Sequence, residues 1–358
     1  MHHELSAGTV LNERFSIVKV IGEGAAGVVY CADDLRETGQ RCAVKEMAPL
    51  HAGEAERREA LAMFRREAEI LKCLDHGGLP KIIDFFSDGE RHYLAMEYIA
   101  GENLHTIAKA RSRPFDYREL APWVLQILSI LEYLHSQPTP VIFRDLKPSN
   151  ILVTKLNRVK LIDFGIARLF APEKTRDTFV MGTPGFSAPE QYGTWQTDGR
   201  SDLYSLAVTI YWLLTGEDPE QFAFRFPPVT QFNAAVPPWL EEALEKCLDE
   251  DPGRRFQSAA EMKGYFEEAA LGRPAMPAPS YASSPPLTGW PAFQKDPPVA
   301  IFVVLGIVLK VLVFPFLVTG DKLLLATIAA LAIATLAVRF FWPAPAGTAP
   351  GVGASAGP

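Results

Sequence analysis

The stretch Phe143-Arg144-Asp145-Leu146-Lys147-Pro148-Ser149-Asn150 places an acid, a lysine and an amide within six residues of one another. A run of strand-forming residues, Ile151 to Val153, follows it directly. Further along the chain stand Leu161-Ile162-Asp163-Phe164-Gly165 and then Ala188-Pro189-Glu190. The combination and order of these segments make the pattern specific.

A glycine-rich segment lies toward the N-terminus and reads Ile21-Gly-Glu-Gly-Ala-Ala-Gly-Val-Val-Tyr30. Its GxGxxG spacing alone is weak evidence, because in a dinucleotide-binding unit such glycines must open a helix. Residues with strand propensity stand on both sides of these glycines, which favours a turn between two strands that covers the phosphates of a nucleotide. The next expected strand, Cys42 to Lys45, ends in a lysine placed to meet α- and β-phosphate oxygens.

With these motifs in this order, the sequence resembles the eukaryotic-like protein kinases, and in detail their bacterial serine/threonine branch. The resemblance covers about Phe15 to Phe266, roughly 70% of the chain. It implies an α+β, two-lobed protein kinase fold. We expect a small β-rich N-lobe near 12–96 and a larger helical C-lobe near 102–268, together a kinase domain over 12–268.

The resemblance assigns catalytic roles that phosphoryl transfer explains, since this reaction mainly needs a positioned acceptor and neutralised charge. Asp145 would accept or orient the proton of the acceptor hydroxyl, and Lys147 would lie near the γ-phosphate of ATP. Asn150 and Asp163 would hold Mg²⁺, or Mn²⁺, through oxygen ligands.

Lys45 needs an anionic partner to hold it in place, and Glu67 matches the glutamate that the family carries on a helix. Glu69 is the alternative, but it points about 200° away from Glu67 on the same helix. We therefore favour Glu67 as the partner.

The resemblance also implies an ATP pocket lined from strands and from the segment between the lobes. Met96 would close its back, while the Glu97 carbonyl and the Ile99 amide would meet the adenine edge. Val29 and Ala43 would cover the adenine faces, although Val29 could equally be ordinary core. The glycines over the phosphates would be Gly22, Gly24 and Gly27.

Other motif residues are expected to be structural. Glu190 and Arg255 are similar to the buried ion pair of the family's large lobe, and Asp202 to the acid that braces the catalytic loop. Phe143 replaces the more common histidine before Arg-Asp, and an aromatic ring can fill that place under Phe164.

A second departure from the family lies at the tip of the glycine loop. Ala25-Ala26 lacks the aromatic that is frequent at the second position, which could leave the phosphates more open to water. Neither departure removes a charged group that the chemistry needs.

Specificity and control are expected in the segment after Asp163. Thr183 would hydrogen-bond Asp145 and line the acceptor groove of a kinase specific for serine and threonine. Arg144 would face the loop 169–181, where Thr175 and Thr178 stand. We hypothesise that phosphorylation there adds negative charge that pairs with Arg144 and orders the loop.

The remaining chain has a different composition. Eight prolines fall within 271–298, which predicts a linker. The apolar runs 299–319 and 323–342 are each close to the roughly 20 residues that span a bilayer as a helix. We therefore predict a C-terminal hairpin of two transmembrane helices over these two runs. Lys310 and Pro315 interrupt the first run, so a re-entrant or interfacial hairpin and a buried soluble helix pair are the alternatives. Residues 343–358 are expected to form a disordered tail.

The N-terminus is polar and lacks the apolar run of a signal peptide. We therefore expect the kinase domain to face the cytoplasm, anchored at the plasma or inner membrane. The net charge is −7, and since residues 273–358 carry +3, the rest carries −10. Such an acidic body is a poor candidate for binding nucleic acid.

Partners expected from these arguments are ATP, protein substrates with Ser or Thr, a lipid bilayer and, as a candidate, a second copy of the chain. The main rival function is a membrane-tethered pseudokinase scaffold. It is disfavoured because Lys45, Glu67, Asp145, Asn150 and Asp163 are all present. A small-molecule kinase is disfavoured by Thr183 and Ala188-Pro189-Glu190, which build a platform for a peptide.

Overall fold

The computed structural model describes residues 4–24, 27–37, 39–47, 68–89, 91–163, 168–169, 183–192 and 196–270. The chain divides into two compact units, Met1–Pro279 and Ser280–Pro358, and every described residue belongs to the first. Several sequence predictions therefore lie outside the described residues. They concern Ala25-Ala26, Glu67, Phe164, Thr175, Thr178, the linker 271–298, the two apolar runs and the tail.

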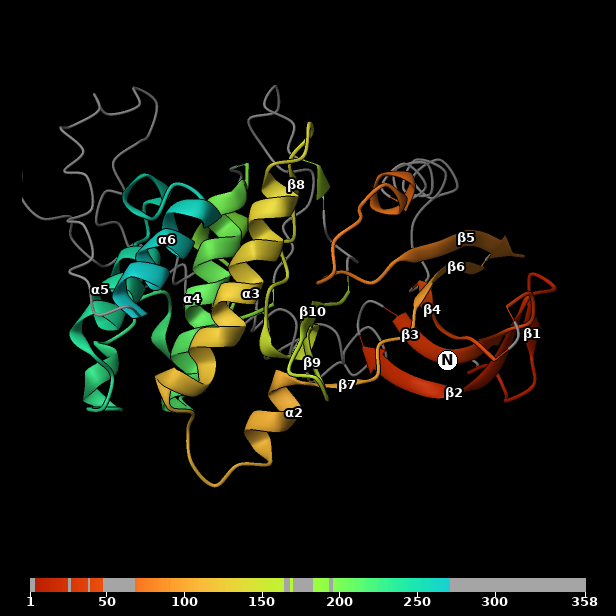
Figure 1. Ribbon diagram of the computed structural model, residues 1–358, viewed down its shortest axis with the longest axis horizontal. Helices are drawn as coiled ribbons and strands as arrows, with labels where there is room; N and C mark the ends of the chain where they lie inside the picture. The colour runs from red at the N-terminus through yellow and green to blue at the C-terminus, as the bar shows by residue number, and fades with distance from the viewer. Residues whose placement is uncertain are drawn as a thin grey trace, which may run out of the picture. The chain divides into compact units, whose positions relative to one another are not determined.

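A six-stranded antiparallel sheet forms the N-terminal part of the first unit, in the order β1-β2-β3-β4-β6-β5 (Figure 1). The glycine-rich segment joins two of its strands, with Gly24 opposite Gly27. The expected turn between strands is thus confirmed, and no helix begins there. The strands are β1 (Val10–Leu11), β2 (Phe15–Gly24), β3 (Gly27–Asp34), β4 (Arg41–Met47), β5 (Ile82–Asp88) and β6 (Arg91–Glu97).

The two faces of this sheet bury different residues, because successive side chains of a strand point to opposite sides. On β4, Val44 packs into a cluster with Phe15 and Tyr30, whereas its neighbour Ala43 packs with Met96 on the other face. Residues directly opposite each other on paired strands share a face. Val29 opposes Lys45, and Ala43 opposes Met96, so these residues share one face of the sheet.

The segment before β5 contacts helix α3 (Tyr117–His135) of the second lobe at a glycine. A Cβ built on Gly78 would stand 2.3 Å from the Cδ1 of Ile130, so any larger residue would force the Ile130 side chain to move. The Gly78 carbonyl accepts a hydrogen bond of 2.8 Å from the Leu161 amide. This close approach joins the sheet to the helical part of the unit.

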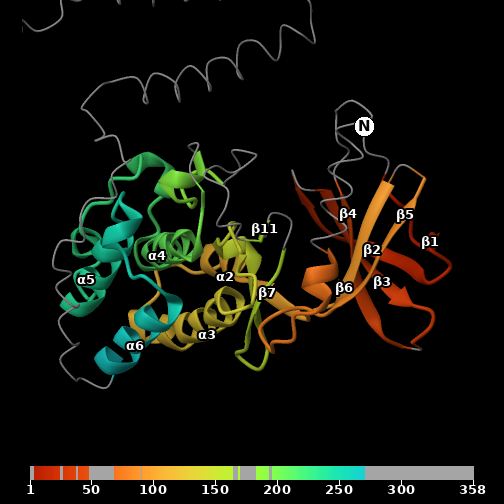
Figure 2. The same cartoon turned by 90° about the horizontal axis from the view of Figure 1, so that it is seen from above.

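Long helices form the second lobe, and α3 begins at a capping box. The Asp116 side chain accepts from the first turn, while Glu119 accepts from the Asp116 amide. The view from above shows α3 alongside α4 (Figure 2). The helices after α3 are α4 (Gly199–Thr215), α5 (Pro238–Cys247) and α6 (Ala259–Ala270), and before it lies α2 (Leu104–Lys109).

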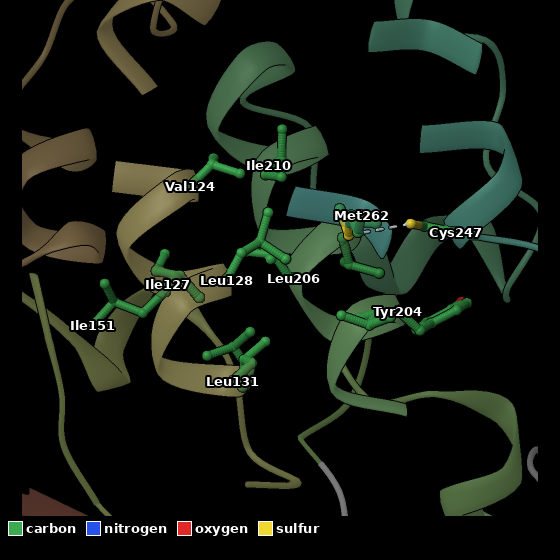
Figure 3. Close-up of a cluster of buried hydrophobic side chains, with 14 of the residues drawn as sticks. Val124, Ile127, Leu128, Leu131, Ile151, Tyr204, Leu206, Ile210, Cys247 and Met262 are labelled. Atoms are coloured by element: carbon green, nitrogen blue, oxygen red, sulfur yellow. Dashed lines mark hydrogen bonds between the residues drawn. The ribbon is translucent and has the colours of Figure 1, made fainter. Parts of the chain in front are cut away.

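Helix α4 is the centre of the core. Every side chain from Ser201 to Leu214 is buried, as expected for a helix surrounded by others. Figure 3 shows Leu206 and Ile210 of α4 facing Val124 and Leu128 of α3. The helix ends at Gly216, whose φ of +77° is the left-handed conformation that favours glycine at a C-terminus.

Short strands and single turns carry the segments between the helices. Strands β7, β9 and β10 form one small sheet, and β8 pairs with β11. Their bounds are β7 (Gly101–Asn103), β8 (Val141–Ile142), β9 (Ile151–Thr154), β10 (Val159–Leu161) and β11 (Arg168–Leu169). The 3-10 turns are η1 (Pro148–Asn150), η2 (Pro189–Tyr192), η3 (Pro219–Phe222), η4 (Val229–Gln231) and η5 (Pro252–Arg254).

The structure places no helix in the described part of the chain that is long and apolar enough to cross a membrane.

Candidate active site

The segment between β8 and β9 carries the acid, lysine and amide of the sequence motif. Arg144 adopts a φ of +65°, a conformation that costs free energy for a residue other than glycine. The carboxylate of Asp202, fully buried on α4, accepts from the amides of Phe143 (2.9 Å) and Arg144 (2.7 Å). These hydrogen bonds hold the loop in its strained shape, and Phe143 is itself fully buried in the main core.

Asp202 has a third partner that sequence reasoning missed. The Nε2 of His135, at the end of α3, lies 2.8 Å from the second carboxylate oxygen and donates to it. Gly199 permits this contact, since a Cβ there would stand 2.7 Å from the His135 ring. The sequence shows only the histidine itself, and nothing near it in the chain names a partner.

The carboxylate of Asp145 collects three donors. Its Oδ2 accepts from the Nδ2 of Asn150 and the Nζ of Lys147, both at 2.8 Å, and its Oδ1 accepts from Thr183 at 2.6 Å. Lys147 also donates to the Thr183 hydroxyl at 2.7 Å. The structure thus brings four residues of the sequence prediction into one hydrogen-bonded group, with the Asp145 side chain 11% exposed.

A second ion pair joins the first sheet to the segment after β10. Lys45, whose side chain is 5% exposed, pairs with the Oδ1 of Asp163. Asp163 also has a positive φ, +71°. Glu69 points away from this pair, because its side chain is 71% exposed and lies near Lys72. Glu67, the expected partner of Lys45, lies outside the described residues.

The donor set of Asn150 and Asp163 fits a hard divalent cation. The Nδ2 of Asn150 donates to both the carbonyl and the side chain of Asp145, which leaves the Oδ1 of Asn150 as an oxygen ligand. Asp163 adds a carboxylate, and phosphate oxygens of a nucleotide would complete the shell. Groups of three or more His, Cys, Asp and Glu that could hold a metal are absent from the described ranges.

The residues expected around adenine lie together on one sheet face. Ala43, Leu94 and Met96 form a small apolar cluster with Ala68, and Val29 packs against it. Residues 98–100 follow β6 as an irregular segment. Ile99, whose amide is expected to meet the adenine edge, lies in this segment. The Glu97 side chain lies near Lys160 at the edge of this segment.

Thr183 begins a loop that is held by a hydrogen bond from Tyr192 and by close packing at Gly185. Tyr192 donates its hydroxyl to the Thr183 carbonyl at 3.2 Å, and burial raises the pKa of this phenol, which keeps it a donor. Gly185 has a φ of +79°, and a Cβ there would stand 2.9 Å from the Glu220 amide nitrogen. The sequence did not single out Tyr192, because its hydrogen bond to Thr183 forms only when the segment between the two residues turns back on itself.

The expected buried ion pair is present. Arg255, fully buried, donates to both carboxylate oxygens of Glu190, at 2.7 and 2.9 Å. Ser201 adds a third hydrogen bond to this carboxylate at 2.7 Å. The adjacent Gln191 donates to the Arg144 carbonyl at 2.8 Å, which ties this pair to the catalytic loop.

The family model for the protein kinase domain matches residues 15–265. The chain therefore belongs to the protein kinase family, within the eukaryotic-like serine/threonine kinases of bacteria. The expected family and the expected kinase fold are both confirmed.

Curated relatives include the serine/threonine-protein kinase PknB of Mycolicibacterium smegmatis, 33% identical over 71% of this chain and 42% of its own. The serine/threonine-protein kinase PrkC of Bacillus subtilis is 29% identical over 73% and 41%. A crystal structure of the PknI kinase domain of Mycobacterium tuberculosis superimposes with a TM-score of 0.61 at 26% identity, covering 74% of this chain and 99% of that one. The chain spans less than half the length of the two curated relatives.

Proposed function

We propose that the chain is an ATP-dependent serine/threonine protein kinase. The observation that carries this proposal is the group formed by Asp145, Lys147, Asn150 and Thr183, in which one carboxylate is held by three donors, one of them a threonine hydroxyl. Such a group can orient an acceptor hydroxyl and take its proton.

In the proposed reaction, the acceptor oxygen forms a bond to the γ-phosphorus as the bond from that phosphorus to the bridging oxygen of ADP breaks. The hydroxyl proton passes to Asp145, whose carboxylate is kept in place by Asn150. The ammonium of Lys147, 2.8 Å from the same carboxylate, lies where it can offset charge that develops on the transferred group. Lys45, fixed by Asp163, would bind the α- and β-phosphates.

Mg²⁺ or Mn²⁺ bound by Asn150 and Asp163 would neutralise phosphate charge. The chain's own residues do the positioning. Asn150 and Lys147 both donate to the Oδ2 of Asp145, and Thr183 donates to its Oδ1, so a serine or threonine hydroxyl of a protein would use the remaining lone pair of Oδ1. We also propose that Thr175 and Thr178 are phosphorylated by the kinase itself, because Arg144 stands next to Asp145 as a cation for the product.

The test uses the full 358-residue chain with Mg²⁺ and radiolabelled ATP. Wild type should label itself and protein acceptors, with mass spectrometry locating phosphate on Thr175 or Thr178. The Asp145→Asn variant should lose about 10²- to 10⁴-fold in transfer rate while it still binds ATP. An exposed acid on β5 supplies the matched control, Asp88→Asn, which should keep the wild-type rate.

The rival scaffold function gives a different result. A pseudokinase would bind ATP in all three proteins and transfer phosphate in none, and that outcome would refute the proposed activity.

We further propose that the chain is anchored by a hairpin of 299–319 and 323–342 at the plasma or inner membrane, with the kinase domain in the cytoplasm, where ATP is. The length and apolar composition of both runs support it. The chain should stay with membranes through an alkaline carbonate wash, and protease added to inverted vesicles should digest its kinase domain. Release into the wash would contradict anchoring. Crosslinking of the anchored chain would test the candidate homodimer.

A further inference from the structure

A cavity of about 530 Å³ lies between the segment 224–229, which follows α4, and the region of α5 and η5. The deepest part of its apolar lining comes from Tyr211 of α4, Val229 of η4, and Leu244 and Leu248 of the α5 region; Phe224, Phe226 and Pro227 also line it. The first four of these residues are buried. The catalytic residues described above do not line this cavity.

The rim of the cavity carries more negative than positive charge. Four acids line it, Glu241, Glu245, Asp249 and Glu250, against two arginines, Arg225 and Arg254, which leaves a formal charge of −2. Among the described residues, both arginines are exposed and make long ion pairs, Arg225 with Glu250 at 3.7 Å and Arg254 with Asp249 and Asp251 at 3.9 Å each. Glu245 is exposed and has no ion-pair partner in the described part of the chain.

One residue of the cavity wall, Phe224, has a strained backbone and contacts the loop that begins at Thr183, which we call the acceptor loop. Phe224 lines the cavity and has a φ of +70°, which a bulky residue rarely adopts; Ala223 before it has +46°. Residues held in such sparsely populated backbone conformations gather at binding sites. The Phe224 ring packs edge-on against Tyr192, with centroids 5.5 Å apart, and Tyr192 hydrogen-bonds Thr183.

We propose that this cavity docks protein substrates through a segment that carries an apolar side chain flanked by arginine or lysine. The apolar floor would take the side chain, and the excess of rim acids, Glu245 foremost, would take the cations. The chain of contacts from Phe224 to Thr183 sets the docked segment beside the loop that receives the acceptor. This inference rests on the proposed kinase function and names the substrates it prefers.

The first measurement needs no catalysis. Fluorescein-labelled Gly-Ser-Arg-Phe-Arg-Ser-Gly and its Gln-Phe-Gln counterpart are titrated with the full chain, and anisotropy gives each Kd. Wild type should bind the arginine peptide more tightly. Glu245→Arg makes the rim neutral and should weaken that binding about tenfold. Glu267→Arg, at an exposed position of α6 outside the cavity, is the matched control and should bind as wild type does.

The second measurement asks whether docking serves catalysis. An acceptor peptide that the full chain phosphorylates is extended by twelve Gly/Ser residues, which span about 19 Å on average, and then by Arg-Phe-Arg or Gln-Phe-Gln. In wild type the arginine extension should lower KM about tenfold relative to the bare acceptor. In Glu245→Arg the two KM values should be equal. Because both peptides are measured with the same enzyme, any change in its basal rate affects both and does not alter their ratio.

Several outcomes would overturn the inference. Equal Kd values for the two labelled peptides would show that charge plays no role in binding. If Glu267→Arg weakened binding of the arginine peptide as much as Glu245→Arg does, the cavity would have no role in binding. Binding without any KM advantage would make the cavity a site for something other than substrates. A rate per enzyme that depends on enzyme concentration, with no KM advantage, would identify a second copy of the chain as the occupant. If the chain is not a kinase, no phosphate will be transferred to any peptide, and the anisotropy measurement will still report whether the cavity binds the labelled peptides.

Discussion

Replacing Arg255 with methionine should destabilise the first unit more than any surface change. The guanidinium of Arg255 is fully buried and makes two hydrogen bonds to Glu190, one to the Asp249 carbonyl at 2.8 Å, and a contact with the Tyr204 ring at 4.8 Å. Methionine keeps much of the volume, so the main loss is electrostatic. Among the described residues, it leaves the buried Glu190 carboxylate with the hydroxyl of Ser201 as its hydrogen-bond donor.

Leaving one charge of a buried pair unpaired costs about 3–5 kcal/mol. For a domain of this size, 1 kcal/mol shifts Tm by about 2–4 °C, so we expect a fall of about 6–20 °C. The assay is urea unfolding of the full chain followed by tryptophan fluorescence, with a thermal scan beside it. Activity should fall only as far as the folded fraction falls.

The adjacent Arg254 supplies the matched control. Its side chain is 74% exposed and its ion pairs are 3.9 Å long, so Arg254→Met should cost less than about 0.5 kcal/mol. The double variant Arg255→Met/Glu190→Leu removes both charges and should recover part of the loss, since an apolar pair needs no compensation. The reasoning is refuted if Arg255→Met and Arg254→Met unfold at the same urea concentration, or if the double variant is the less stable by the sum of both losses.

Three further predictions concern single contacts. Thr183→Val should lower kcat/KM about 10- to 100-fold with the Kd of ATP unchanged, because it removes a hydroxyl bonded to a carboxylate, whereas Thr183→Ser should keep most of the activity; equal rates would contradict this. Gly78→Ala should cost about 1–3 kcal/mol in urea unfolding because its methyl would overlap Ile130, while Gly77→Ala, with open space around it, should change little. The pKa of Asp34 is lowered by the guanidinium that hydrogen-bonds it, so its contribution to stability is present above the unfolded pKa of about 4 and lost as the pH falls through the lower folded pKa. Asp34→Asn should therefore destabilise by about 2 kcal/mol at pH 7 and by clearly less at pH 3, and a loss independent of pH would exclude the ion pair as its cause.

Part of the active site could be predicted because its chemistry is written locally. Asp145, Lys147 and Asn150 lie within six residues, and the short turn between two strands brings their side chains together. The glycine-rich turn was likewise predictable, because the propensities of its neighbours indicate strands and exclude the helix of a dinucleotide-binding unit. Thr183 and Arg255 were assigned through the family resemblance, since no local rule pairs residues that far apart.

Other contacts had no signal in the sequence. His135 and Asp202 are 67 positions apart in the chain, and their hydrogen bond exists because α3 and α4 pack through Leu128, Leu206 and their neighbours. A histidine at a helix end can face water as easily as a carboxylate. The contact of Phe224 with Tyr192 depends in the same way on how the chain after α4 returns beneath the acceptor loop.

The sequence by itself determined the family, the residue types of the catalytic group and the strands around the glycines, because these depend on short-range order and on the chemistry of single side chains. Tertiary structure alone decided which buried partner braces the catalytic loop, that Gly78 lies against Ile130, and that a cavity with an acidic rim lies beside the acceptor loop. Those features arise where elements distant in the chain pack together, and the close packing of a protein interior fixes which side chains meet, which a pattern of residues along the chain does not specify.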